Sequence, residues 1–336
     1  MKIRVAVLGA GSWGTTIAST ASHNAETVLW SRREDVAEQI NARHCNERYL
    51  PGFALHTALR ASCSLADVVS GADVVVMGVP SHAFRQTLEE GSGYLRAWVP
   101  VVSLAKGFEQ GTNLRMTEVA AEVVPGHPTG VLTGPNLAKE ILGGHAAAAV
   151  LAMVDEHISV RLQEIFATEL FRMYTNVDVI GCEVAGAFKN VIALASGMAD
   201  GLGTGDNTRA AVITRGLNEL TRLGIAMGGD PLTFAGLAGM GDLVATCISP
   251  QSRNRYVGEQ LGKGRALDEI IAEMNQVAEG VKAVRVVKEL ADEYGLDLPI
   301  VNEVYAVVVD GHPAADAYRG LLRRRVGRET IYSINR

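Results

Sequence analysis

The first half of the chain alternates between short apolar runs and stretches with the spacing of amphipathic helices. The apolar runs, typical of buried strands, cover residues 3–8, 27–30, 74–79, 101–105, 129–132 and 146–153. Helical patterns lie between them, at residues 34–42, 84–90 and 116–123. Continuous apolar strands separated by helices predict a doubly wound parallel sheet, whose ligands bind outside the carboxyl ends of the strands.

From residue 179 onward the strand signals nearly vanish and apolar residues recur at helical spacing. Two such stripes are Val184, Phe188, Val191, Ile192 and Ala195, and then Val212, Ile213, Leu217, Leu220 and Leu223. The sequence therefore predicts an α/β domain over residues 1–178 and an all-α domain over residues 179–336. A cleft between two such domains is the expected place for an active site.

Composition places the chain among globular proteins. It has 336 residues, of which 48% are hydrophobic and 20% charged, and its net charge is −6. A protein with this balance is a poor non-specific ligand for nucleic acid or anionic membranes. An anionic substrate would therefore have to be attracted by a local cluster of cations.

The cysteines and the most apolar stretch do not change this picture. Cys45, Cys63, Cys182 and Cys247 are scattered without metal-ligand spacing, which predicts buried free thiols in a reducing compartment, the cytoplasm. The apolar stretch 180–199 carries charged residues, so we expect a buried core helix and not a membrane span. The glycines that follow residue 8 argue against a signal peptide.

A glycine motif follows the first predicted strand. Gly9, Gly11 and Gly14 have the spacing G-x-G-x-x-G and lead directly into a predicted helix. The first glycine allows a tight turn, the second lets the backbone approach a pyrophosphate, and the third lets the helix pack closely on the strand. Free N–H groups at the helix start would hold the anion, which predicts a Rossmann-type dinucleotide-binding domain.

Two arginines, Arg32 and Arg33, follow the second predicted strand, about twenty residues after the glycines. NAD-selective domains usually have an acid there, which binds the ribose 2′-hydroxyl. Guanidinium groups suit a 2′-phosphate instead, because arginine binds phosphate in bidentate fashion. We therefore expect NADP(H) to be preferred, with NAD(H) possible; two solvated arginines at a helix start are the alternative.

Two lysines are candidates for the reacting site. Lys106 follows the predicted strand 101–105 directly, which would aim it at a substrate, although a solvated surface lysine has the same pattern. Lys189 interrupts an apolar helical stripe, and a buried lysine is a useful proton donor or acceptor near neutral pH. A lysine that extends to the domain surface is the alternative for Lys189.

Loops with the features of anion sites recur along the chain. Gly134 opens a loop whose helix start would offer N–H groups, and Asp242 ends a glycine-rich loop. Ser252, Arg253 and Asn254 open a predicted helix and together suit a phosphate, although Ser252 could equally be only a helix cap. The eight histidines form no triad and no ligand spacing, so neither a catalytic histidine nor a metal site is expected.

Taken in order, these motifs resemble those of the bacterial NAD(P)-dependent sn-glycerol-3-phosphate dehydrogenase family across essentially the whole chain. The matching segments are 9–14, 79–81, 106–107, 134–135, 183–190 (Glu-Val-Ala-Gly-Ala-Phe-Lys-Asn), 238–243, 252–254 and 278–280. The run 183–190 with Ser-Arg-Asn downstream is the most specific part. One departure is Asn136-Leu137 after Gly134-Pro135, where the family usually has Ser-Phe.

The resemblance implies that dihydroxyacetone phosphate is reduced to sn-glycerol 3-phosphate for glycerophospholipid synthesis, with Lys189 as the proton donor or acceptor and Lys106 as a second catalytic cation. It implies substrate contacts at Lys106, Gly134, Asn136, Lys189, Asp242, Ser252, Arg253 and Asn254. It implies a cofactor site lined by Ser12, Trp13, Arg32, Arg33, Lys106, Ala138, Arg253, Val277 and Glu279 beside the three glycines. Asp242 is a candidate to orient one of the two lysines.

Two other functions stay open at this stage. Hydroxyacyl-thioester and phosphogluconate dehydrogenases also join a dinucleotide domain to a helical one, although Ser252-Arg253-Asn254 favours a small phosphate. A non-catalytic NADP(H)-sensing protein would keep the glycines and Arg33 but would need neither lysine in a reacting site. By base rate we expect a homodimer that binds a small-molecule substrate.

Overall fold

The computed structural model describes residues 3–274 and 278–324. The chain folds into two compact units. The first comprises residues 1–186 and 228–242, and the second comprises 187–227 and 243–336. The chain passes from one unit to the other within helices α8 (Val179–Gly201) and α11 (Asp242–Ile248) and between residues 227 and 228.

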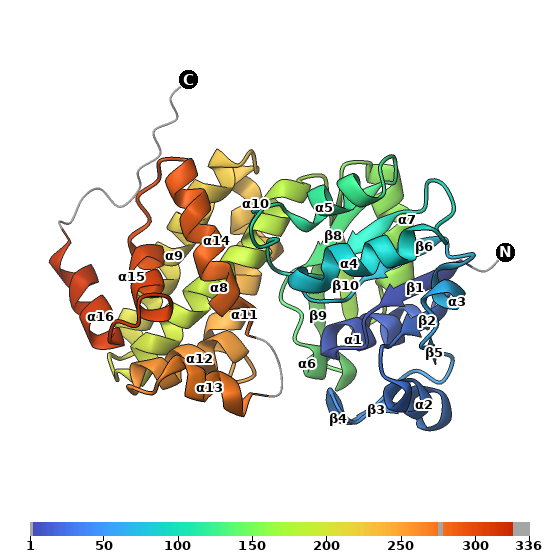
Figure 1. Ribbon diagram of the computed structural model, residues 1–336, viewed down its shortest axis with the longest axis horizontal. Coiled ribbons are helices and arrows are strands. Elements are labelled where there is room, and N and C mark those ends of the chain that lie inside the picture. The colour runs from blue at the N-terminus through green and yellow to red at the C-terminus, as the bar shows by residue number, and fades with distance from the viewer. Residues whose placement is uncertain (1–2, 275–277, 325–336) are drawn as a thin grey trace. The chain divides into compact units, whose positions relative to one another are not determined.

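The first unit is built on a twisted, mostly parallel sheet (Figure 1). Its strand order is β10-β9-β8-β7-β6-β1-β2-β5. The bounds are β1 Arg4–Leu8, β2 Glu26–Trp30, β5 Arg60–Ser62, β6 Val74–Met77, β7 Val101–Ser103, β8 Thr129–Thr133, β9 Ala147–Met153 and β10 Phe171–Asn176. A separate hairpin is formed by β3 (Cys45–Asn46) and β4 (Leu50–Ala54). All six strands expected from the sequence are confirmed.

The expectation of an all-parallel sheet is wrong at one place, since β9 runs antiparallel to β8. The connection between them contains only the short helix α6 (Ala138–Leu142). It returns the chain alongside β8 in the opposite direction, and β10 then pairs with β9 in parallel. The sheet is otherwise parallel, and the doubly wound class is confirmed.

Helices cover both faces of the sheet because strand residues alternate between them. Val5 and Val7 of β1 pack with helices α1 (Ser12–Ala21), α2 (Glu34–Arg43) and α7 (Glu156–Phe166). Ala6 and Leu8 face the opposite side and pack with α3 (Leu65–Val69), α4 (Ser81–Ser92) and α5 (Met116–Val123). Each face therefore has its own apolar core, and the strand ends stay available for ligands.

Three backbone segments meet at the carboxyl end of β1. A Cβ on Gly9, which has φ +123°, would lie 2.7 Å from the carbonyl carbon of Gly78, and a Cβ on Gly14 would lie 2.1 Å from the Gly9 carbonyl oxygen. A Cβ on Gly11 would have no heavy atom within 4 Å. Gly9 and Gly14 are thus required by packing, whereas the backbone at Gly11 is open.

The described part of the second unit is helical. It contains most of α8 together with α9 (Asp206–Ala226), α12 (Arg253–Gly262), α13 (Leu267–Glu273), α14 (Glu279–Glu293), α15 (Pro299–Val308) and α16 (Ala314–Arg323). Most of α11 also lies in the second unit. Two short elements after α9, α10 (Pro231–Ala235) and the π-helical turn η1 (Leu237–Gly241), belong to the first unit. The predicted all-α character of the second half is confirmed for these residues (Figure 1).

A buried carboxyl group joins two helices of the second unit. Glu219 of α9 is 4% exposed and accepts hydrogen bonds from the backbone N–H groups of Ile300 (2.8 Å) and Val301 (3.2 Å), at the start of α15. Burial raises the pKa of Glu219 to about 7, against the opposing effect of these two N–H donors. The carboxyl group is thus a helix cap that titrates near neutral pH.

The four cysteines are all free. The expectation that they are buried holds for Cys182 and Cys247 and is wrong for Cys63, which is exposed, and for Cys45, which is half-buried. Cys63 directly follows β5, the short strand at the edge of the sheet. Burial raises the pKa of the Cys182 thiol far above its usual range.

We expect the substitution Gly14→Ala to lower the free energy of unfolding by about 1–3 kcal/mol, because its methyl group would overlap a backbone oxygen that cannot move independently. Gly11→Ala is the matched control, since its methyl group meets open space and its φ of −68° suits alanine. Thermal unfolding of the two variants should separate them. Equal melting temperatures would contradict the packing role of Gly14.

Glu219 predicts a pH dependence of stability. Its pKa in the folded protein, about 7, lies above the ordinary 4.5, so the folded state binds a proton that the unfolded state lacks between these values. The free energy of unfolding should therefore fall as pH rises from about 4.5 to 7, by roughly 3 kcal/mol at most, with no further effect above that window.

Urea unfolding at several pH values checks this expectation. Glu219→Gln should remove the slope in that window, whereas Glu289→Gln, on the exposed side of α14, should keep it. If the Glu219 variant retains the full slope, another group is responsible.

Candidate active site

The glycine loop between β1 and α1 is open to an anion. Helix α1 begins at Ser12 without a side-chain cap, so its first N–H groups are available. The loop is fixed from behind by Asn46, whose amide donates to the Ala10 carbonyl (3.0 Å) and to Thr15 Oγ1 (2.9 Å). Ser12 Oγ donates to the Tyr49 carbonyl at 3.0 Å. The open backbone at Gly11 and the uncapped helix start fit the pyrophosphate of a dinucleotide.

Arg32 and Arg33 are exposed and follow β2, the neighbour of β1 in the sheet. The Gly9 N–H donates to the carbonyl of Trp30, the last residue of β2, at 3.1 Å, so the glycine loop and the end of β2 adjoin. The Arg33 guanidinium binds Asp35 through two hydrogen bonds, Nε to Oδ1 at 2.9 Å and Nη2 to Oδ2 at 3.1 Å. The arginines therefore lie where the ribose end of a bound dinucleotide is expected.

Lys106, Gly134, Asn136 and Asp242 meet at one point of the first unit. The Lys106 ammonium donates to Asn136 Oδ1 at 2.6 Å, Asp242 Oδ2 at 2.8 Å and the Gly134 carbonyl at 3.0 Å. The Lys106 side chain is 13% exposed and that of Asp242 is 3% exposed. The sequence left open which lysine Asp242 contacts, and Lys106 is one of its partners in the structure.

The loop after β8 brings these partners to the lysine. Gly134 has φ +119°, and a Cβ there would lie 3.1 Å from the Cα of Ala149 in β9. Only glycine suits this conformation and this close approach. Asn136 uses its oxygen for Lys106, and its Nδ2 is buried without an acceptor among the described residues. This amide is a donor that a ligand can satisfy, and Ala138 follows as the first residue of α6.

Lys189 lies in the middle of α8 and is 4% exposed. Its ammonium donates to Thr246 Oγ1 at 2.8 Å. A hydrogen bond to a hydroxyl helps to hold this buried ammonium in position. The alternative of a lysine that extends to the surface is wrong for Lys189.

Asn254 connects three elements of the second unit. Its Nδ2 donates to Asn190 Oδ1 on α8, and its Oδ1 accepts from the Gly280 N–H on α14, both at 2.9 Å. Ser252 is the N-cap of α12 and accepts from the Arg255 N–H at 3.2 Å. The helix cap considered for Ser252 is therefore present, and the residue's role toward a ligand stays a prediction.

Arg253 begins α12 and Glu279 begins α14. Although Arg253 keeps an exposed surface, the protein around its guanidinium lowers its pKa, and the charge of Glu279 acts in the opposite direction. The ordinary pKa of a guanidinium lies so far above neutral that Arg253 remains charged at pH 7. Val277, a further expected cofactor contact, lies outside the described residues.

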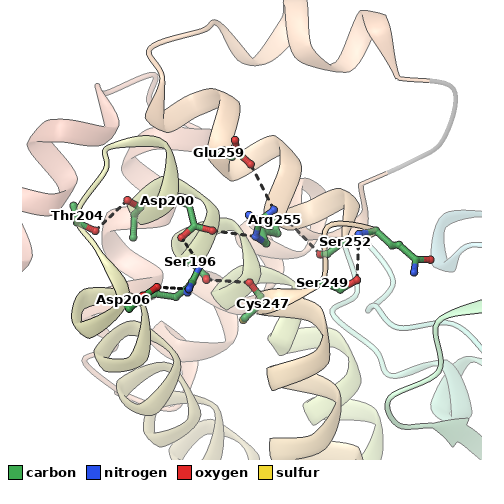
Figure 2. Close-up of polar contacts among 12 residues, drawn as sticks. Ser196, Asp200, Thr204, Asp206, Cys247, Ser249, Ser252, Arg255 and Glu259 are labelled. Atoms are coloured by element: carbon green, nitrogen blue, oxygen red, sulfur yellow. Dashed lines mark hydrogen bonds and ion pairs between the residues drawn. The ribbon is translucent and has the colours of Figure 1, made fainter. Parts of the chain in front are cut away.

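Figure 2 shows how α12 is fixed to the end of α8. Arg255 Nε lies 3.0 Å from Asp200 Oδ2, and its Nη1 lies 3.5 Å from Glu259. The helices also approach backbone to backbone, since a Cβ on Gly197 would lie 2.0 Å from the Arg255 carbonyl oxygen and one on Gly258 would lie 2.1 Å from that of Leu194. This packing sets the position of Asn254 relative to Asn190.

Glu183, which opens the most specific sequence run, has a structural environment in the first unit. It is buried and accepts hydrogen bonds from the Thr117 N–H (2.9 Å), Thr117 Oγ1 (2.5 Å) and Arg115 Nη1 (2.8 Å). Burial raises its pKa, although Arg115 and Thr117 act against this. Glu183 thus connects α8 to the start of α5.

Sequence reasoning missed several residues that support these groups. Thr246, the partner of Lys189, lies one helical turn after Asp242, and this spacing was the only available signal. Asn46 is far from the glycine loop in sequence. Gly78 directly follows a strand, and nothing in the sequence around it indicates its contact with Gly9 and Gly14. Their importance follows only from contacts in the folded chain.

Two further structural features concern metal sites and helices that could span a membrane. The residues that the structure describes contain no group of three His, Cys, Asp or Glu side chains able to hold a metal ion. By length and composition one described helix, Val179–Gly201, could cross a membrane, but 94% of its most apolar window is buried, as in the core helix of a globular protein.

A doubly wound sheet, a glycine loop open to pyrophosphate, and a buried lysine in a helical second unit together define a dinucleotide-dependent oxidoreductase. The family models for the N-terminus and C-terminus of NAD-dependent glycerol-3-phosphate dehydrogenase match residues 4–159 and 178–319. The chain belongs to the NAD-dependent glycerol-3-phosphate dehydrogenase family.

Relatives and solved structures agree with this assignment. The chain is 57% identical over 329 residues to glycerol-3-phosphate dehydrogenase [NAD(P)+] 2 of Sphingopyxis alaskensis, covering 98% of this chain and 99% of that one. It is 56% identical over 327 residues to glycerol-3-phosphate dehydrogenase [NAD(P)+] of Mycobacterium avium, covering 97% of this chain and 96% of that one. The crystal structure of glycerol-3-phosphate dehydrogenase from Coxiella burnetii has a TM-score of 0.92 at 36% identity, covering 96% and 99%.

Asp242 generates a prediction for the lysine cluster. Asp242→Asn keeps the shape of the side chain but leaves the Lys106 ammonium without its carboxylate. Breaking a buried ion pair costs about 3–5 kcal/mol, and less here to the extent that water reaches Lys106. The free energy of unfolding, measured with urea, should fall accordingly.

The double variant Lys106→Met with Asp242→Asn should recover part of this loss, because it removes the orphaned charge. Asp155→Asn is the control, since Asp155 is the N-cap of α7 and asparagine caps equally well. An Asp242 variant as stable as the wild type would contradict the importance of this ion pair.

Proposed function

We propose that the protein reduces dihydroxyacetone phosphate to sn-glycerol 3-phosphate, with Lys189 as the proton donor and NADP(H) as the preferred cofactor over NAD(H). The observation that supports this most directly is the burial of Lys189, whose ammonium is fixed by Thr246. A fixed cation with few water contacts is the group that ketone reduction requires, because negative charge develops on the carbonyl oxygen.

The cofactor would be held by the glycine loop and the residues around it. Gly9, Gly11, Gly14, Ser12 and Trp13 would contact the pyrophosphate, and Arg32 and Arg33 the adenosine end. The remaining proposed contacts are Lys106, Ala138, Arg253, Val277 and Glu279. When bound, the reduced cofactor supplies a hydride to C2 of the ketone.

Lys189 then completes the reaction. Its ammonium donates a hydrogen bond to the carbonyl oxygen, stabilises the developing alkoxide and transfers a proton to it. The product is the secondary alcohol, and the neutral amine regains a proton from solvent. Thr246 keeps Nζ in place because its hydroxyl accepts one of the ammonium's N–H bonds at 2.8 Å. In the reverse direction the neutral amine accepts the proton.

The phosphate of the substrate would be bound by Arg253, Asn254 and Ser252 at the start of α12. Lys106 and the free Nδ2 of Asn136 would contact the polar groups nearer the reacting carbon, with Gly134 shaping the loop. Asp242 keeps the Lys106 ammonium in position. Binding energy from the remote phosphate would fix the ketone in a reactive orientation.

The wider assignments belong to the same proposal. Residues 1–178 would supply the dinucleotide-binding domain and residues 179–336 the substrate-binding domain, although 179–186 and the returning segment 228–242 belong to the first compact unit. The protein acts as a homodimer in the cytoplasm and supplies glycerophospholipid synthesis. Initial rates with dihydroxyacetone phosphate, 6-phosphogluconate and a 3-ketoacyl thioester test the substrate class, and gel filtration with light scattering tests the dimer.

Lys189→Met should lower kcat for dihydroxyacetone phosphate by about 10²–10⁴-fold, because it removes the proton donor while filling the buried space. NADPH affinity, measured by fluorescence titration, should remain close to that of the wild type. Lys282→Met, at an exposed position of α14, is the control. A Lys189→Met enzyme that retains its turnover would exclude the proposed proton donor and favour a sensing role.

A further inference from the structure

Arg33 and Asp35 form an ion pair, and the two residue types favour different nicotinamide cofactors. At the end of β2 an acid favours NAD(H), because it binds the ribose 2′-hydroxyl, and an arginine favours NADP(H). Arg33 lies at the position where either is expected, and Asp35 follows two residues later. In this structure the carboxylate occupies one bidentate edge of the guanidinium, formed by Nε and Nη2.

We propose that Asp35 is a specificity-determining residue, which competes with the 2′-phosphate of NADPH for Arg33 and so keeps the preference for NADPH over NADH small. This inference rests on the proposed cofactor role of Arg33.

The main chain of Arg33 is held in place by hydrogen bonds to Ser31. Ser31, which is buried, accepts the Arg33 N–H on its Oγ at 3.1 Å and donates to the Arg33 carbonyl at 3.0 Å. Arg33 is also the N-cap residue of α2, with extended φ and ψ. Because the main chain is held in this way, the guanidinium can exchange the carboxylate for a phosphate only by side-chain motion.

The charges then decide the sign of the effect. A 2′-phosphate that binds Arg33 would have to displace the Asp35 carboxylate or lie beside it. Displacement breaks the ion pair, and a position beside the carboxylate brings two negative groups together, so both weaken phosphate binding. The 2′-hydroxyl of NADH is neutral and meets no such opposition. The hydrogen bond to Asp35 raises the pKa of Arg33, and the hydrogen bond to Arg33 lowers the pKa of Asp35, so both groups are charged at neutral pH.

The size of the effect follows from exposure. The two side chains are 49% and 51% exposed, and ion pairs of this kind contribute little, so we expect changes of about two- to five-fold. Asp35→Asn should tighten the binding of NADPH by this factor and change the binding of NADH by less. Isothermal titration of NADPH, NADH, adenosine 2′,5′-bisphosphate and ADP measures this without turnover.

Glu34→Gln is the matched control, since it removes the same charge at the same helix start and leaves the Arg33–Asp35 pair intact. It should change the affinity for NADPH less than Asp35→Asn does. An equal effect of the two variants would mean that only the general field of α2 acts, which overturns the inference. So would weaker NADPH binding in Asp35→Asn, because Asp35 would then orient Arg33 for the phosphate.

The variants Arg33→Ala and Arg33→Ala with Asp35→Asn separate this inference from the proposed role of Arg33. Arg33→Ala should weaken NADPH binding, and Asp35→Asn should have no selective effect in its background. If Arg33→Ala leaves NADPH binding unchanged, Arg33 is no phosphate ligand, and both statements fall. If Arg33→Ala weakens NADPH binding but Asp35→Asn alone has no effect, Arg33 remains a phosphate ligand and only the proposed role of Asp35 is wrong.

Discussion

The contact among Gly9, Gly14 and Gly78 is the constraint on which the nucleotide-binding unit depends. The carbonyl of Gly9 lies where a side chain of Gly14 would begin, and Gly9 itself packs on the main chain at Gly78. Helix α1 can therefore start directly over the end of β1. This places its free N–H groups at the carboxyl edge of the sheet, beside the end of β2 and its arginines. The open glycine loop at this edge therefore depends on the close packing of the three glycines.

The protein has a net charge of −6, yet it holds two lysine ammonium groups in largely buried positions. Lys106 has a carboxylate, an amide oxygen and a carbonyl as partners, whereas Lys189 is bound to a hydroxyl. The Asp242 carboxylate balances the charge of Lys106, and the Thr246 hydroxyl helps to orient Lys189. Both side chains are largely buried, so each ammonium is held in a defined position by groups of the protein.

Much of the fold could be predicted because it follows from local patterns. The six apolar runs became strands β1, β2, β6, β7, β8 and β9, and the three helical patterns became α2, α4 and α5. The edge strands β5 and β10 were missed because neither contains a continuous apolar run: β5 has only three residues, and polar residues interrupt β10. The reversed direction of β9 was not predictable, because pairing direction is decided by how the connection packs and not by the strand's own residues.

The site was predictable where a motif has a fixed position on an element, as for the glycine loop. Asp242 was a candidate partner of the lysines, but the contacts of Thr246 and Asn136 with them were not predictable, because these residues lie on other elements, far away in sequence. The pairing of Arg33 with Asp35 involves neighbours in the sequence, yet it depends on the side chains bending back at the start of α2. Sequence spacing alone does not specify such a contact.

The way the chain is divided between its two compact units affects how the protein can be dissected. Residues 228–242 return to the first unit after helix α9, and Ala238 packs there with Val131 and Val150 of the sheet. A fragment that stops near residue 178 would lack this returning segment and, with it, the Asp242 carboxylate. Neither unit corresponds to one uninterrupted stretch of polypeptide, so the gene cannot be cut once to yield two complete modules.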